Sequence, residues 1–144
     1  MNNSNDFYET ANAFCTLIES MPIVEKSHYK EFLCFLSKLY FEAMYLQDVE
    51  LLDDMDIRAE HITISFGEVD GYREFYNPHE CEKTVCGSLS DDFGDIYIEL
   101  KTGIMLYEKG YINNAFWNWK WSFENHWSYH AVDAMRALNQ LINR

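Results

Sequence analysis

The sequence predicts an all-α protein, an irregular bundle of about five or six helices with an acidic, loop-rich middle segment. Apolar residues recur at the helical period of 3.6 residues near both ends of the chain. After residue 111 the chain contains neither Gly nor Pro, the residues that most often interrupt helices. Residues 61–66 alternate as a strand does, but no second strand is recognisable for them to pair with. With 144 residues, the chain is expected to form one helical domain over residues 1–144.

Two helices are predicted in the first third of the chain. The first spans residues 5–21 and ends at Pro22, because Pro cannot continue a helix. The second begins near Ser27, a residue type that caps helix N-termini. Their apolar faces consist of Phe7, Ala11, Phe14, Cys15 and Ile18 in the first helix and of Phe32, Phe35, Leu36, Leu39, Tyr40, Ala43 and Met44 in the second. The short loop between them, residues 22–26, favours antiparallel neighbours.

The middle segment, residues 48–87, is the least regular part of the sequence. Residues 49–57 are predicted to form a short acidic helix, and residues 61–66 a loop or short helix. Turns are expected at Gly67, Gly71, Asn77, Pro78 and Gly87, since these residue types favour turn conformations.

Regular helical spacing returns at Ser88. Ser88 or Ser90 can cap a helix whose first turn carries Asp91 and Asp92, and Gly110 supplies its C-terminal stop. Its apolar face is Phe93, Ile96, Tyr97, Leu100, Ile104 and Tyr107. Beyond it, one long stripe follows the same period: Ala115, Trp119, Phe123, Trp127, Ala131, Ala134, Leu138 and Leu141. A break in this second stripe is expected near residues 125–128.

Three sequence blocks lie in this region. They read S-L-S-D-D-F-G-D-I-Y from residue 88, A-F-W-N-W-K-W-S-F from residue 115 and H-W-S-Y-H-A-V-D-A-M-R-A-L from residue 126. They resemble the S-L-S-D-D-L-x-D-I-Y and W-x-W-x-x-S-F-x-x-H-W-G-x-H-A blocks of a bacterial family, domain of unknown function 5063. The resemblance is densest over residues 88–141 and implies a fold but no activity.

The net charge of −13 is concentrated in the middle of the chain. Residues 48–99 contain 15 acidic and three basic residues, whereas the rest of the chain is nearly neutral. This balance disfavours nucleic acid and anionic membranes as partners, because both require a basic surface. It favours a basic protein partner, and solubility alone is the simpler explanation.

Cysteine usage and the N-terminus predict a cytoplasmic location. The N-terminus carries no basic residues before an apolar stretch, and no apolar run reaches the length of a membrane span. The four cysteines are therefore expected to be reduced thiols. Cys81 and Cys86, beside His79, form one loose pair where a zinc ribbon needs two closer ones.

Two patterns resemble metal sites. Asp91, Asp92 and Asp95 spell the D-D-x-x-D pattern of isoprenoid synthases, which holds magnesium and diphosphate, but acids in a first helical turn also suit the helix dipole. His126 and His130 have a spacing that binds zinc if a third ligand is present. The favoured explanation is buried or half-buried packing, with their ring nitrogens bonded to backbone or to an acidic neighbour. The sequence therefore predicts no catalytic residue, metal or cofactor.

Trp117 and Trp121 lie one helical turn apart, on the side opposite Trp119. They are either sandwiched between helices or exposed as anchors for a partner. The favoured function is a non-enzymatic acidic module that binds a basic protein, such as an immunity protein that neutralises a toxin. The expected contact surface is Asp53, Asp54, Asp56, Glu60, Glu68, Asp70, Trp117 and Trp121.

Two alternatives remain open. One is a metal-dependent hydrolase or phosphate-handling enzyme that uses the aspartate cluster, with His126 and His130 as further ligands. The other is a housekeeping adaptor or scaffold.

Overall fold

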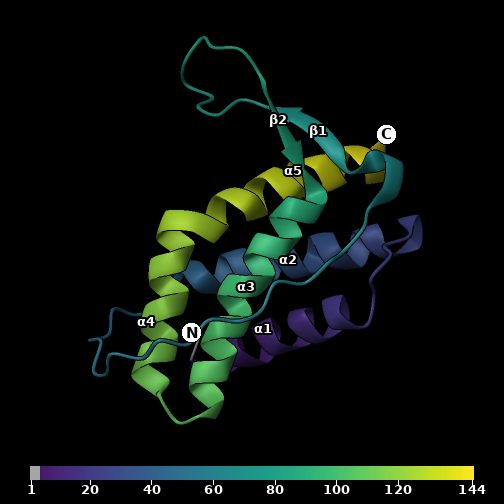
Figure 1. Ribbon diagram of the computed structural model, residues 1–144. Helices are drawn as coiled ribbons and strands as arrows, with labels where there is room; N and C mark the ends of the chain where they lie inside the picture. Colours follow the sequence, from purple (N-terminus) through teal and green to yellow (C-terminus); the bar gives the residue numbers. More distant parts are fainter. Residues whose placement is uncertain (1–3) are drawn as a thin grey trace.

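The computed structural model describes residues 4–144, which are mostly helical (Figure 1). The expected helical fold is confirmed with one correction, because the described residues also form a two-stranded antiparallel sheet. The α-helices are α1 (Ser4–Glu19), α2 (Tyr29–Met44), α3 (Leu89–Glu108), α4 (Ile112–Ser122) and α5 (Ser128–Asn143). The strands are β1 (Gly71–Glu74) and β2 (Val85–Ser88). Short helical turns occur at η1 (Lys26–His28), η2 (Gly67–Val69) and η3 (Phe123–Trp127), of which η3 is π-helical.

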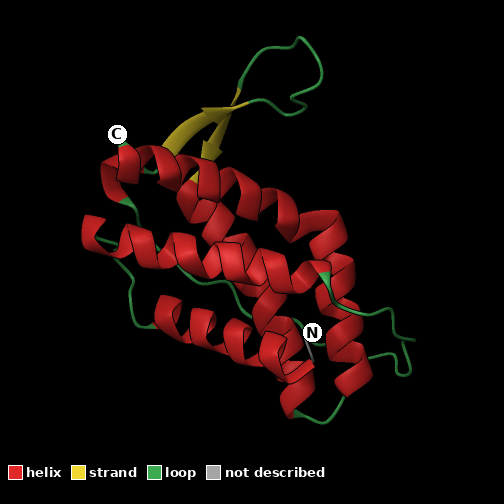
Figure 2. Ribbon diagram, turned by 180° about the vertical axis from the view of Figure 1, so that it is seen from behind, coloured by secondary structure: helices red, strands yellow, loops and turns green. Residues whose placement is uncertain are grey.

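Helix α3 lies at the centre of the arrangement and packs against α1, α4 and α5. Helix α2 packs against α1 and α5. Figure 2 shows α1, α2 and α5 in one stack, with α3 and α4 crossing it. The helices joined by short connections, α1 with α2 and α3 with α4, are neighbours as predicted. None of the described helices is long and apolar enough to cross a membrane.

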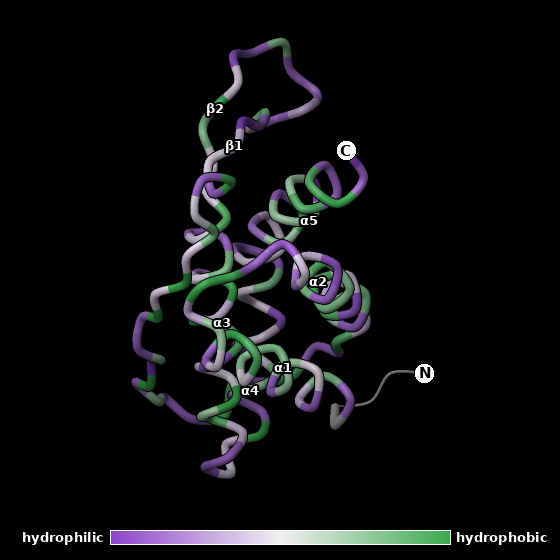
Figure 3. Tube along the Cα trace, turned by 90° about the vertical axis from the view of Figure 1, so that its right-hand side faces the viewer, coloured by the Kyte–Doolittle hydropathy of each residue, from purple (hydrophilic) through white to green (hydrophobic). Residues whose placement is uncertain are grey.

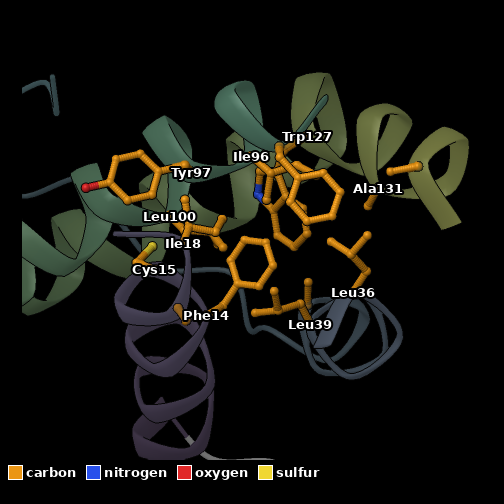
Figure 4. Packing of buried hydrophobic residues seen from close by; sticks show 14 of the residues in the cluster. Phe14, Cys15, Ile18, Leu36, Leu39, Ile96, Tyr97, Leu100, Trp127 and Ala131 are labelled. Carbon is orange, nitrogen blue, oxygen red and sulfur yellow. The ribbon is translucent and has the colours of Figure 1, made fainter. Parts of the chain in front are cut away.

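An aromatic core joins the helices of this arrangement. Phe14 of α1 contacts Phe32 of α2 and Phe93 of α3, with ring centroids 6.3 and 5.9 Å apart. Figure 4 shows Phe14, Leu36 of α2 and Trp127 pointing toward one another between the helices. These residues belong to the apolar stripes read from the sequence, whose members are mostly buried. Met44, which the sequence placed on the apolar face of α2, is the last residue of that helix and is exposed.

A glycine on α3 makes room for a tryptophan of α4. The Trp119 indole of α4 donates a hydrogen bond from Nε1 to the Leu100 carbonyl of α3, at 3.0 Å. A Cβ at Gly103 would collide with this indole ring. Gly103 therefore gives the fully buried Trp119 the space that it occupies against α3.

Residues 49–57 form no helix, so the prediction of a short acidic helix there was wrong. The backbone of this segment bonds to side chains of the bundle instead. The Asn114 side chain of α4 accepts from the Asp53 N–H at 3.3 Å and donates to the Asp53 carbonyl at 2.8 Å. Farther along, Thr102 of α3 accepts from the Ala59 N–H at 2.9 Å. The segment is thereby held extended along α4 and α3.

One residue of the alternating segment 61–66 pairs through its backbone with the loop that follows α1. Ser65 and Ile23 form an isolated parallel bridge, because the Val24 N–H donates to the Ser65 carbonyl and the Ser65 N–H donates to the Pro22 carbonyl, each at 2.9 Å. Ile64 and Phe66 are buried. The alternation therefore marks an extended segment with one buried face, and the expectation of a loop here was correct.

The hairpin of β1 and β2 was missed because each strand has only four residues. Gly71 pairs with Ser88, and Tyr72 pairs with Gly87, so the predicted turns at the two glycines are strand residues instead. A Cβ at Gly87 would collide with the Tyr72 ring. Gly87 therefore allows the Tyr72 side chain to lie across the hairpin toward α3.

The predicted ends of α3 are confirmed. The Ser88 hydroxyl caps its N-terminus by accepting from the Asp91 N–H at 3.3 Å. Gly110, with φ of 93°, follows the C-terminal residues of α3 in a left-handed conformation that favours Gly. The break expected near residues 125–128 is the π-helical turn η3, which begins two residues earlier and joins α4 to α5.

We predict that Gly103→Ala destabilises the protein by about 1–3 kcal/mol, because the added methyl group overpacks the α3–α4 contact. Gly94→Ala is the matched control, since a Cβ there meets ordinary contacts, the nearest being His61 Cε1 at 3.7 Å. The control is expected to be neutral or stabilised by up to about 1 kcal/mol through helix propensity. Urea unfolding followed by circular dichroism measures both, and equal stabilities would contradict the packing argument.

Candidate metal centre

Helices α3 and α5 bring carboxylates and imidazoles together where they pack. Asp92, Asp95 and Glu99 lie at positions i, i+3 and i+7 of α3, which share one helix face. His126, at the end of η3, and His130, in the first turn of α5, are four residues apart. His130 pairs with Asp92 and His126 pairs with Glu99, so the two elements run in opposite directions here.

The Nε2 atoms of both histidines point toward one carboxylate. Asp95 Oδ2 lies 3.0 Å from His130 Nε2 and 3.7 Å from His126 Nε2. One ligand atom from each of the three residues falls within 4.8 Å of the others. The imidazole rings are nearly perpendicular, at 84°, with centroids 4.9 Å apart. Three donor atoms of the types that bind transition metals therefore converge on one point.

The Nδ1 atoms of the same histidines are held by two other carboxylates. His130 Nδ1 lies 2.7 Å from Asp92 Oδ1, and His126 Nδ1 lies 2.7 Å from Glu99 Oε2. The side chains of Asp92 and Glu99 are only 5% and 6% exposed. A carboxylate in this position accepts the Nδ1 proton, which leaves Nε2 as the free nitrogen. The buried carboxylates therefore fix the tautomer that a metal ion requires.

The second oxygen of each buried carboxylate also has a donor. Tyr72 of β1 donates its hydroxyl proton to Asp92 Oδ2. The Arg58 guanidinium, from the extended middle segment, binds Glu99 Oε1 at 2.7 Å. Both oxygens of each buried carboxylate are thus engaged, as burial of a charged group requires.

Hydrogen bonding and burial shift the pKa values of both His130 and Asp92. The hydrogen bond to Asp92 raises the pKa of His130 above its ordinary value, and burial opposes this shift. Burial raises the pKa of Asp92, whereas the hydrogen bonds from His130 and Tyr72 oppose that shift. In the metal-free protein, the stability from the protonated His130 is fully present below the ordinary histidine pKa and is lost as the pH rises through the raised value.

The π-helical turn supplies one of the two imidazoles. Within η3, Phe123 and Trp127 point into the core, with ring centroids 4.8 Å apart, while His126 is half-buried at the centre described above. Single π-helical turns inside α-helices occur frequently at functional sites. The π-helical turn therefore contributes side chains both to the core and to the histidine pair.

Only two of the three aspartates in the D-D-x-x-D pattern belong to the histidine–carboxylate cluster. Asp92 and Asp95 face the histidines, whereas Asp91 is exposed beside the Ser88 cap. The pairing of His126 and His130 with acidic neighbours agrees with the half-buried packing expected from the sequence. What the spacing could not show is that both histidines share Asp95. No cysteine belongs to a metal-ligand cluster within residues 4–144, and the four thiols carry no disulfide.

Tyr72 and Arg58 were missed by the sequence analysis. They lie 20 and 41 residues before their carboxylate partners, in segments without a helical pattern. No local spacing marks either of them.

The residues expected to bind a partner fall into two groups. Asp53, Asp54 and Trp117 line one shallow hollow beside α4. Trp121 is 51% exposed and stacks on Trp117, with ring centroids 5.9 Å apart and ring planes inclined by 10°. The tryptophan pair is therefore not enclosed between helices.

The remaining acids of that set are spread over the length of α3. Asp56 and Glu60 are exposed along the extended segment, and Glu68 is exposed in η2. Asp70 accepts from the Ser88 hydroxyl and the Ser90 N–H, each at 2.7 Å, at the start of α3. Since the 20 residues of α3 span about 30 Å, Asp70 lies at the opposite end of that helix from Asp53 and Asp54.

The fold and the site together define a mostly helical protein with a cluster of two histidines and three carboxylates at a helix interface. A family model, domain of unknown function 5063, matches residues 1–143, and the chain therefore belongs to this family. The crystal structure of protein BF1032 from Bacteroides fragilis is similar in fold, with a TM-score of 0.74 and 20% sequence identity. The similarity covers 96% of this chain and 94% of that one. No curated protein matches the chain.

We predict that His130 in the metal-free protein titrates above the ordinary histidine pKa of about 6.5 and that Asp92→Asn lowers its pKa. The reason is that the hydrogen bond to the carboxylate favours the imidazolium form. Histidine-ring NMR spectra recorded across a pH series measure the titration. An unchanged His130 titration in the folded variant would contradict the assigned pairing.

Proposed function

We propose that this protein is a metal-dependent enzyme that binds one divalent transition-metal ion through Asp95, His126 and His130. The observation that carries the proposal is the convergence of both Nε2 atoms on Asp95, with each Nδ1 anchored to a buried carboxylate. Carboxylate–histidine–metal arrangements of this kind orient the ligand and raise its basicity.

The distances suit a metal of the size of zinc. Ligand bonds of about 2.0–2.1 Å in tetrahedral geometry separate the donor atoms by about 3.3 Å. The observed separations from Asp95 Oδ2 to the two Nε2 atoms, 3.0 and 3.7 Å, lie on either side of this value. Two imidazoles and one carboxylate favour Zn²⁺ or Fe²⁺ over Mg²⁺, which prefers oxygen ligands. The supported site is therefore different from the magnesium–diphosphate site that D-D-x-x-D resembles.

Three protein ligands leave a coordination position for water or substrate, as in catalytic zinc sites. The side chains of Asp95 and His126 are 36% and 37% exposed, so solvent has access to that position. A bound zinc ion lowers the pKa of its water and generates a nucleophile near neutral pH. Hydrolysis is the reaction class that this arrangement supports best.

A second candidate function is the acidic binding module, which is supported at the other end of α3. The stacked Trp117 and Trp121 lie next to the exposed Asp53 and Asp54. Exposed tryptophans beside carboxylates suit the cationic surface of a basic protein, such as a toxin that an immunity protein neutralises. This surface is separate from the metal centre, so the two proposals can be tested independently.

We predict that the purified protein binds one Zn²⁺ per chain and that His126→Ala, His130→Ala and Asp95→Asn each abolish this stoichiometric binding. Glu99→Gln and Asp92→Asn are expected to weaken it by about 10–100-fold, because these residues orient the ligands without contacting the ion. Isothermal titration calorimetry and elemental analysis measure affinity and stoichiometry. Anaerobic titration with Fe²⁺ distinguishes the two metals that the donor set suits.

His79→Ala is the matched control, because it removes an exposed imidazole from the loop between β1 and β2. Equal zinc binding by the His130→Ala and His79→Ala proteins would overturn the assignment. The zinc-loaded protein is then assayed with p-nitrophenyl phosphate and p-nitrophenyl acetate. Turnover that is lost in His130→Ala and retained in His79→Ala supports hydrolysis.

For the second candidate, we predict that a basic protein partner binds less tightly as salt rises, and that replacing Asp53, Asp54 and Asp56 by Lys abolishes its binding. Pull-downs from the native organism at low and moderate salt, read by mass spectrometry, identify the partner. Unchanged capture by the triple variant would exclude this surface.

A further inference from the structure

A cleft of about 810 Å³ lies between α5 and the β1 side of the hairpin. Tyr72, Arg73 and Glu74 line it from β1. Asp133, Arg136 and the terminal Arg144 line it from the α5 side. Figure 3 shows β1 and the C-terminal part of α5 at the same end of the molecule. This volume is typical of a small-molecule site.

The charge of the cleft differs from that of the chain. The chain has a net charge of −13 and only four arginines, and three of them line this cleft. The fourth, Arg58, is paired with Glu99. Arginine presents a planar fork of donors that matches the oxygens of a carboxylate or a phosphate.

The Arg73 side chain lies on the hairpin face that bears Thr84 and Cys86, opposite the face that bears Tyr72, so Arg136 and Arg144 are the arginines available to a ligand in the cleft. Arg73 donates from Nε to Thr84 Oγ1 at 2.9 Å and from Nη1 to Cys86 Sγ at 3.7 Å, so its partners are neutral residues of the hairpin. Arg136 and Arg144 are exposed. Within residues 4–144, none of the three forms an ion pair with a carboxylate.

The acids of the cleft carry less negative charge than their number suggests. Burial and a hydrogen bond with Glu74 raise the pKa of Asp133 to about 8. Two adjacent carboxyl groups that share a proton carry one negative charge in place of two. Glu68 is the third carboxyl group that lines the cleft.

We propose that this cleft binds a small organic anion through a carboxylate or phosphate group held by Arg136 and Arg144. Identifying this anion as the substrate rests on the proposed metal-dependent function. Tyr72 connects the two sites, because it lines the cleft and donates to Asp92, the carboxylate that holds His130. Asp133 lies one turn beyond His130 on α5. The cleft therefore adjoins the residues that hold His130.

The test uses ¹⁵N-labelled protein that has been stripped of metal and dialysed. Sodium phosphate and sodium succinate are titrated separately, at an ionic strength kept constant with sodium chloride. The side-chain Nε–Hε resonances of the arginines report binding. Saturable shifts are expected at Arg136 and Arg144, with Arg58 unchanged as the internal reference. The anion that saturates at the lower concentration shows whether the cleft favours phosphate or carboxylate.

Arg136→Gln is expected to lower the affinity for the preferred anion by at least about tenfold, the typical effect of losing a charge-assisted hydrogen bond. Lys109→Gln removes the same charge at the C-terminal end of α3, the end away from the hairpin, and is expected to leave the affinity unchanged. Equal losses in both variants, shifts of equal size at Arg58 or the absence of saturation would overturn the proposal. Because the protein is metal-free, these results do not depend on whether the metal assignment is correct.

Discussion

The burial of Asp92 and Glu99 in the interface between α3 and α5 is the constraint on which much of the structure depends. A carboxylate removed from water is costly unless its oxygens find donors. The four donors come from four separate places: the hairpin, the extended middle segment, the π-helical turn and α5. Satisfying two charges therefore fixes four parts of the chain against α3, including the two that are not helical.

The helices were predictable because their apolar residues recur over many turns. Most of the fully buried apolar positions of α1, α3 and α5 are members of the stripes seen in the sequence, with Leu89 of α3 an exception, and the Ser88 cap and Gly110 stop are local features. The hairpin was not predictable, since four-residue strands give too few alternations. The segment at residues 49–57 was misjudged for a different reason: its conformation is set by Asn114, a distant side chain.

The site was predictable only in its helical parts. The spacing of His126 and His130, and of Asp92, Asp95 and Glu99, placed each set on one face of a helix, but the packing of the two faces against each other is a tertiary property. The acidic residues between positions 48 and 99 give the same lesson. Their charges read as one surface in the sequence, yet Asp70 caps α3, Asp92 and Glu99 are buried acceptors, and Asp53 lies at the far end of the helix.

The π-helical turn η3 joins α4 to α5 and sets the rotation of one helix relative to the other. Each residue of an α-helix advances the side-chain direction by about 100°. Removing one residue from this turn would therefore rotate the face that bears His130 by that angle relative to the face that bears Trp119. The core and the imidazole pair could not then both keep their neighbours on α3. The π-helical turn therefore allows the apolar face that bears Trp119 and the polar pair of imidazoles both to face α3.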